Sequence, residues 1–248
     1  MKNQEFENIL EKYADLVVNI GLNLQSDQGL VIIAGPFEVA PLVRKIMKKA
    51  YQNGCRYVSV LWEDHLADLV RYQNAPEGTF GEYASWKHRG VLECIERGDA
   101  FLQVAGRDPD LLKDVNYEIL NTANRAYTES VQPIRAHQAK NTMQWTVVCP
   151  PTPGWASCVY PDLKPEAAEE QLWGEIIKVC RLDEPDPSAY WEKYLASINA
   201  RADYLTEKAF QTLIFTGPGT ELEVGLPKGH IWLGGGDKTV AGLPFAAN

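Results

Sequence analysis

"LVIIAGPFEVAPLVRKIMKKAYQNGCRYVSVLW", residues 30–62, is the stretch of the chain that decides its fold. It opens with a continuous apolar run (30–35), which is typical of a strand buried on both faces. Apolar residues then recur with helical spacing from Val39 to Ala50, and Gly54 suits the end of that helix. A second strand is predicted at 56–62. This order of elements predicts a βαβ unit with two parallel strands and a right-handed crossover.

The same pattern continues in both directions. Upstream, the apolar spacing from Phe6 to Leu24 predicts an amphipathic helix. Downstream, a helix near 82–97 is followed by a strand at 99–106, a long polar helix at about 117–139 and a strand at 145–150. Strands separated by helices predict an α/β fold, a doubly wound domain with a mostly parallel sheet.

Residues beyond 150 differ in character. Prolines mark a loop with a short helical stretch, and helices are predicted at about 165–181 and 187–208. "QTLIFTGPGTELEVGLP" (211–227) then predicts a β-hairpin that turns at Gly217–Gly219. We therefore expect an α/β domain at 1–208 and the beginning of a β-rich domain at 209–248.

Composition excludes several classes of function. The formal net charge of −9 argues against a nucleic-acid partner, because phosphate contacts need clustered Lys and Arg. The five cysteines form no C-x-x-C pair, which favours free thiols and a cytoplasmic protein. No apolar run approaches the ~18 residues that span a membrane, so no membrane partner is expected.

The turns after the first two strands carry candidate site residues. "AGPFEVAP" (34–41) lacks G-x-G-x-x-G, and Pro36 and Phe37 replace its small residues, so a structural turn is favoured over a nucleotide site. "WEDH" (62–65) places Glu63, Asp64 and His65 side by side. Neighbours on a strand point to opposite faces, so an acidic helix N-terminus is favoured over a metal site there.

The remaining candidates lack a catalytic pattern. His88 and His137 have no metal-ligand spacing and are expected on exposed helix faces. No G-x-S-x-G elbow is present, and no cysteine has a local catalytic signature. "GGGDKT" (234–239) has the wrong spacing for a P-loop, so the glycines predict a wide β loop or a loop that lines a neighbouring site.

Several long segments together resemble one known family. They are "YADLVVNIGLNLQSDQGLVI", "ERGDAFLQVAGRDPDLL", "WTVVCPPTPGWASCVYPDL", "LWGEIIKVCRLDEPDPSAYWEKYLASINARADYL" and "FTGPGTELEVGLPKGHIWLGGG". In order and over essentially the whole chain, they resemble the thermophilic-type metallo-aminopeptidases, the aminopeptidase T and PepS group. The resemblance implies a homodimer that acts on peptides with two divalent metal ions, zinc or cobalt, in a C-terminal catalytic domain.

The resemblance also implies what this chain lacks. The family's metal ligands begin with a glutamate in a P-T-E-E-V-F-like motif, and no "TEEVF" occurs in residues 1–248. No catalytic, cofactor-binding or metal-ligating residue is therefore assigned, and we expect a chain truncated before the active site that binds no metal and is inert alone. His230 and Trp232 would either face that site or simply pack.

Two alternatives remain open. One is a stand-alone α/β binding or assembly module without catalysis, although an open hairpin and a glycine-rich tail argue against it. The other is a nucleotide-binding enzyme, for which no phosphate-binding pattern is found.

Overall fold

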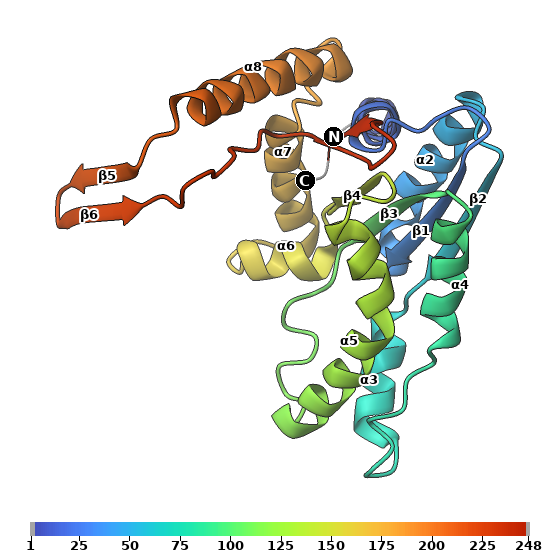
Figure 1. Ribbon diagram of the computed structural model, residues 1–248. Coiled ribbons are helices and arrows are strands. Elements are labelled where there is room, and N and C mark those ends of the chain that lie inside the picture. The colour runs from blue at the N-terminus through green and yellow to red at the C-terminus, as the bar shows by residue number, and fades with distance from the viewer. Residues whose placement is uncertain (1–2, 247–248) are drawn as a thin grey trace.

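The computed structural model describes residues 3–246 and shows a parallel sheet enclosed by helices (Figure 1). The strands are β1 (Gly29–Gly35), β2 (Tyr57–Trp62), β3 (Ala100–Ala105), β4 (Trp145–Val148), β5 (Thr212–Gly217), β6 (Thr220–Gly225), β7 (Asp237–Lys238) and β8 (Pro244–Phe245). The helices are α1 (Asn3–Leu16), α2 (Ala40–Gln52), α3 (His65–Asn74), α4 (Trp86–Glu96), α5 (Tyr117–Ala139), α6 (Pro153–Val159), α7 (Pro165–Val179) and α8 (Pro187–Lys208). A π-helical turn (Val17–Gly21) follows α1, and a 3-10 turn (Phe37–Val39) precedes α2.

The central sheet has the strand order β2-β1-β3-β4, and every pair is parallel. Leu30 of β1 lies opposite Val58 of β2 and Ala100 of β3, so the three strands start at the same level. The prediction of a doubly wound, parallel α/β domain is confirmed. The helix at 65–74 was not predicted from the sequence, whereas the other main helices lie where the apolar spacing places them.

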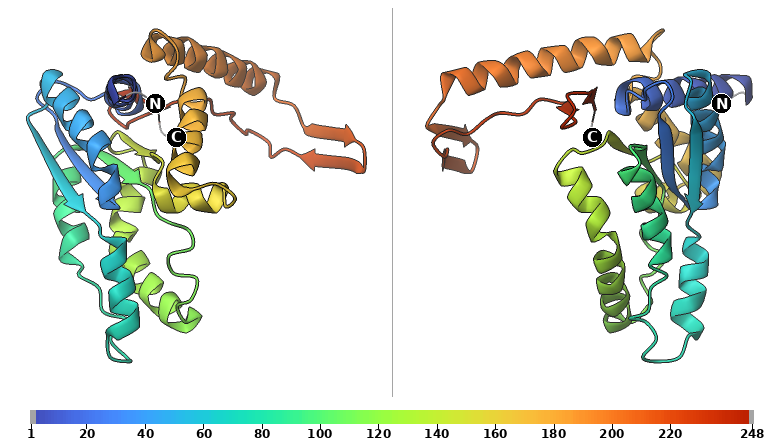
Figure 2. Two further views of the ribbon diagram at one scale, coloured as in Figure 1. Left: turned by 180° about the vertical axis from the view of Figure 1, so that it is seen from behind. Right: turned by 45° about the vertical axis from the view of Figure 1, so that its right-hand side comes forward.

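Both faces of β1 are buried, as its unbroken apolar run predicts. Leu30, Ile32 and Ala34 belong to a core formed with α1 and α2. Val31 and Ile33 belong to a second core formed with α4 and α5. Helices therefore cover the sheet on two sides, and the loops that connect them lie at the sheet's two ends (Figure 2).

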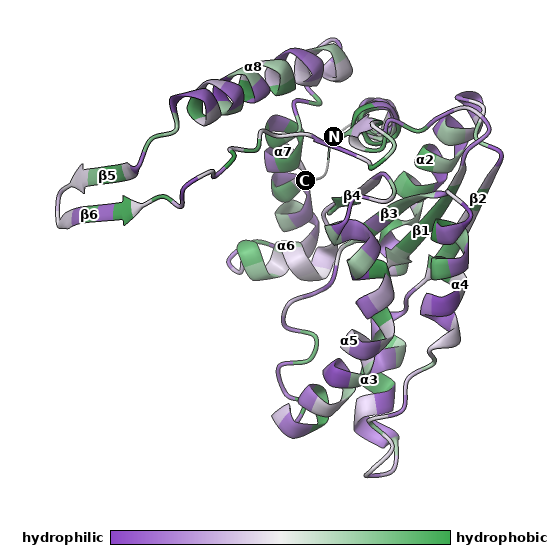
Figure 3. Ribbon diagram, in the orientation of Figure 1, coloured by the Kyte–Doolittle hydropathy of each residue, from purple (hydrophilic) through white to green (hydrophobic). Residues whose placement is uncertain are grey.

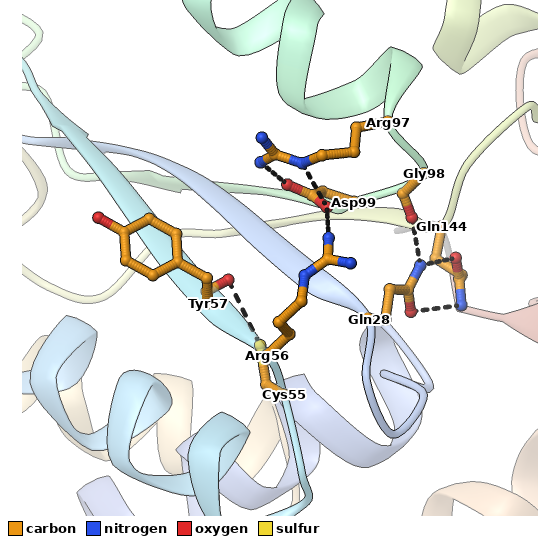
Figure 4. A network of polar contacts seen from close by, with 8 residues as sticks. All are labelled: Gln28, Cys55, Arg56, Tyr57, Arg97, Gly98, Asp99 and Gln144. Atoms are coloured by element: carbon orange, nitrogen blue, oxygen red, sulfur yellow. Dashed lines mark hydrogen bonds and ion pairs between the residues drawn. The ribbon is translucent and has the colours of Figure 1, made fainter.

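A polar network closes the amino end of the sheet (Figure 4). The carboxylate of Asp99, whose side chain is 2% exposed, accepts hydrogen bonds from Arg97 Nη2 at 2.5 Å and Arg56 Nη2 at 3.3 Å. Nearby, Gln28 donates to the carbonyl of Gly98 and to the side chain of Gln144. These bonds join the segments that lead into β1, β2, β3 and β4, so this end of the sheet is fixed by structural contacts.

The chain then leaves the sheet. After α7, helix α8 runs across the molecule to the antiparallel hairpin β5–β6, which projects away from the sheet (Figure 1). The hairpin is confirmed as predicted, with Gly219 in its turn at φ +73°. The following segment returns along α8 to the body, where the Ala246 amide bonds to the carbonyl of Gly21 and Phe245 is buried.

Candidate functional site

A polar cavity of about 430 Å³ opens at the carboxyl end of the sheet, and we call it the sheet-edge pocket. It is enclosed by residues from the ends of β1, β2 and β3, from α3 and α5, and from the loops and helix start around α4. Its lining is Gly35, Trp62, Glu63, Asp64, His65, Ala67, Asp68, Arg71, Tyr72, Tyr83, Lys87, Gln103, Val104, Ala105, Arg107, Leu112, Ala123, Asn124 and Tyr127.

The position of the pocket follows from the connections of the strands. The chain leaves β1 toward α2 on one face of the sheet and leaves β3 toward α5 on the other. Adjacent strands whose connections diverge leave a crevice at their carboxyl ends, and ligands of open α/β sheets bind there. Gly35 keeps this crevice narrow on one side, because a β-carbon at that residue would lie 2.7 Å from the carbonyl oxygen of Glu63.

The "WEDH" turn contributes a helix cap and a paired acid to this pocket. Asp64 is the N-cap of α3, and its Oδ1 accepts hydrogen bonds from the amides of Leu66 and Ala67 at 3.0 and 3.2 Å. The interpretation of this turn as an acidic helix N-terminus is therefore confirmed for Asp64.

Glu63 and His65 turn out to face each other. Glu63 Oε2 lies 4.0 Å from His65 Nε2. His65 holds the pKa of the Glu63 carboxyl below its usual range, although burial acts in the opposite direction. His65 itself is 6% exposed, and its Nδ1 is buried without a hydrogen-bond partner in the described part of the chain. The pair is thus a buried polar element at the wall of the pocket.

The expectation that His88 is exposed is wrong. Its side chain is 2% exposed and packs between Tyr83, 5.2 Å away between ring centroids, and Tyr127, at the same distance. His88 Nδ1 lies 2.9 Å from the hydroxyl of Ser130 on α5. Burial lowers the pKa of His88 and raises that of Tyr127. The face of α4 that looked polar in sequence is covered because α5 and the loop before α4 supply partners for its histidine.

The other sequence candidates lie elsewhere. Phe37 stacks on Trp62 with 5.5 Å between ring centroids, so its turn has an aromatic contact where a phosphate loop has small residues. His137 is only partly exposed and bonds to Thr142 at 2.6 Å. All five cysteines are free, in agreement with the prediction of free thiols.

The glycine-rich segment packs on α8. His230 Nδ1 donates to the carbonyl of Pro227 at 2.8 Å, and the Trp232 amide donates to Thr206 of α8 at 2.9 Å. A β-carbon at Gly234 would overlap the side-chain oxygen of Asn199. Glycine at this position therefore leaves room for the side chain of Asn199 on α8, whereas Gly219, Gly229 and Gly242 adopt positive φ in turns.

Metal ligation depends on the donor side chains that the fold brings together. Within residues 3–246, no group of three or more His, Cys, Asp or Glu side chains is placed to hold a metal ion. The Glu63–His65 pair is the nearest approach at the sheet-edge pocket, and it supplies two donors. The described residues therefore do not fit a two-metal hydrolytic centre, which needs bridging carboxylates together with histidines.

Comparison with known proteins adds the family. The family model described as thermophilic metalloprotease (M29) matches residues 6–248. The chain belongs to the M29 family. An M29 relative, Aminopeptidase 2 of Geobacillus stearothermophilus, is 37% identical over 98% of this chain, and Aminopeptidase T of Thermus aquaticus is 36% identical over 96%.

A solved structure agrees with the fold of this M29 chain. The structure titled wild-type AmpT from Thermus thermophilus superposes with a TM-score of 0.91 at 33% identity and covers 98% of this chain. The chain spans 59% of the length of that protein and 59% of Aminopeptidase 2. None of the helices between residues 3 and 246 combines the length and the hydrophobicity that a transmembrane segment requires.

Proposed function

We propose that this protein is a metal-dependent aminopeptidase that releases N-terminal amino acids from peptides. The observation that carries the proposal is the 32–37% identity, over 96–98% of this chain, to relatives that are named as aminopeptidases. Two divalent metal ions, zinc or cobalt, are part of the proposal for the protein that contains the family's catalytic domain.

We further propose that residues 1–248 alone do not hydrolyse peptides and contain no catalytic or metal-ligating residue. The donor groups of residues 3–246 support this, because they form no cluster suited to a metal. The purified chain would be incubated with Zn²⁺ or Co²⁺ and leucine p-nitroanilide. We expect no release of nitroaniline above a metal-only control. Release that a chelator abolishes would contradict the inertness and would strengthen the aminopeptidase assignment.

The activity itself is tested on the reading frame that encodes this chain. We expect a P-T-E-E-V-F-like segment after Asn248 and chelator-sensitive hydrolysis by the product of the whole frame. A stop codon at that point, with a soluble folded product that hydrolyses nothing, would favour the stand-alone α/β binding module instead.

The organisation of the protein is also a proposal. We place a domain boundary between 208 and 209, which the projection of the hairpin beyond α8 supports (Figure 1). The five free cysteines support a cytoplasmic, reducing location. Exposed apolar side chains on the hairpin, such as Ile214 at 73%, support a homodimer. Light scattering on the protein as it elutes from a size-exclusion column measures its mass and thereby distinguishes a monomer from a dimer.

A further inference from the structure

The sheet-edge pocket contains charged groups that the fold itself does not use. Of its cations, Arg71 donates to the carbonyls of Thr79 and Glu82 at 3.0 and 2.8 Å and is thereby committed to the loop after α3. Lys87 and Arg107 also line the cavity, and neither makes a side-chain hydrogen bond or ion pair with another described residue. Both attract the carboxylate of Asp68 through space, and Arg107 also attracts that of Glu63. Two cations are thus available to a ligand.

One acid of the pocket is likewise available. Asp64 caps α3, and Glu63 faces His65. Asp68, one turn further along α3, has no hydrogen bond to its carboxylate within the described residues. Partial removal from water raises the pKa of Asp68, and the nearby His65, Arg107 and Lys87 offset this only in part. An ammonium group placed beside Asp68 would lower its pKa further. The pocket therefore offers a carboxylate and two cations that attract one another through space but form no direct hydrogen bond or ion pair in the described residues.

The chemistry of the lining suits a small molecule with charges of both signs. The chain as a whole carries a net charge of −9, whereas the three acids that line the pocket are balanced by three cations. Gln103 and Asn124 add amide groups, and Tyr72 and Tyr127 add aromatic walls. A volume of about 430 Å³ lies within the usual range for small-molecule sites. Figure 2 shows α3 and α5 extending past the carboxyl end of the sheet, and Figure 3 shows the mixture of polar and apolar residues on them.

We propose that the sheet-edge pocket binds a free amino acid or a dipeptide in its zwitterionic form. The ligand's carboxylate lies toward Lys87 and Arg107, and its α-ammonium group lies toward Asp68. This assignment goes beyond the aminopeptidase proposal, because it concerns binding by the α/β domain and requires no hydrolysis.

Calorimetric titration of the 248-residue chain tests the proposal with four probes. Leucine and leucylleucine carry both charges, N-acetylleucine lacks the ammonium group, and leucinamide lacks the carboxylate. We expect saturable binding of leucine, of leucylleucine or of both, which identifies the size of the ligand, and binding about tenfold weaker for each singly charged probe. Absence of saturable binding by both zwitterions at millimolar concentration would overturn the proposal. Equal binding of N-acetylleucine would do the same, because it would indicate a simple anion site.

Variants locate the two ends of the ligand. We expect Asp68→Asn to bind leucine no more tightly than N-acetylleucine. We expect Lys87→Gln or Arg107→Gln to bind leucine no more tightly than leucinamide. Matched controls are Glu77→Gln, an exposed acid just beyond α3, and Arg89→Gln, an exposed cation two residues from Lys87. Circular dichroism checks that each variant is folded. Folded pocket variants that keep the wild-type preferences would place the ligand elsewhere and refute the assignment.

Discussion

Asp99 at the amino end of the sheet allows the stability of this fold to be tested with one substitution, Asp99→Asn. The change keeps the size of the side chain, removes its charge and turns an amide toward the guanidinium groups of Arg97 and Arg56 (Figure 4). A mismatched polar group at a buried position costs about 1–3 kcal/mol. We take about 2 kcal/mol, because Asp99 is 2% exposed while both arginines are nearly half exposed, at 46% and 48%, and keep access to water.

For a chain of this length, each kcal/mol lowers the melting temperature by about 2–4 °C, so the expected decrease is about 4–8 °C. Differential scanning calorimetry at pH 7 measures it, with Glu96→Gln as the control. Glu96 is a nearby exposed acid whose loss of charge should leave stability almost unchanged. A melting temperature of Asp99→Asn within about 1 °C of that control would refute the view that the buried carboxylate organises this end of the sheet.

Three further predictions concern close approaches and pH. Gly29→Ala would overlap the carboxylate of Asp99 and should lower the urea midpoint, with a loss of about 1–3 kcal/mol in unfolding free energy. Gly234→Ala should destabilise through overlap with Asn199, and adding Asn199→Ala should recover most of the loss in a double-mutant cycle. Burial lowers the pKa of His88, so the unfolded chain takes up a proton near pH ~6.5 that the folded chain binds only at lower pH. Stability should therefore fall as the pH drops below ~6.5, and His88→Gln should reduce that fall in thermal melts between pH ~7.5 and ~5.5.

Each of these has its own control. Gly90→Ala, on a helix with nothing near the added β-carbon, should leave the midpoint unchanged or raise it, and an equal loss there would remove the steric argument for Gly29. Failure of the second alanine to rescue Gly234→Ala would show that the two positions act independently. A folded His88→Gln variant that loses as much stability as the wild type between pH ~7.5 and ~5.5 would contradict the assignment to His88.

The parallel sheet could be predicted because each of its strands is a short continuous segment with a strong apolar pattern. The apolar run at 30–35 is buried on both faces, as it must be when helices cover both sides. The helix at 117–139 has the predicted bounds even though it contains Pro133. Proline has no amide hydrogen to donate to the carbonyl one turn earlier, but Pro133 is exposed, so water can bond to that carbonyl instead. Helix α3 was not predicted, although Leu66, Leu69 and Val70 recur with helical spacing. Its apolar side chains lie outside the two cores, and Leu66 and Val70 are 61% and 60% exposed.

The candidate site could be predicted only in part. The acidic cap at Asp64 has a local signal, because it precedes a helix start. The pocket does not, since Asp68, Lys87 and Arg107 come from separate elements and share no spacing in sequence. The burial of His88 depends on aromatic partners from a loop and from α5, which only the tertiary fold brings together. Sequence periodicity carries information about one element at a time, whereas a pocket is a property of several.

The hairpin β5–β6 has a consequence for the dynamics of the molecule. All residues of β6 are exposed, and the hairpin stands apart from the four-stranded sheet (Figure 1). Opening it therefore breaks few contacts of the main core, and segments of this kind open without global unfolding. Amide hydrogens at 212–225 should exchange with deuterated solvent far faster than those of β1, and a protease should cleave first near Gly219. The chain would thus behave in solution as a slowly exchanging body with one rapidly exchanging arm.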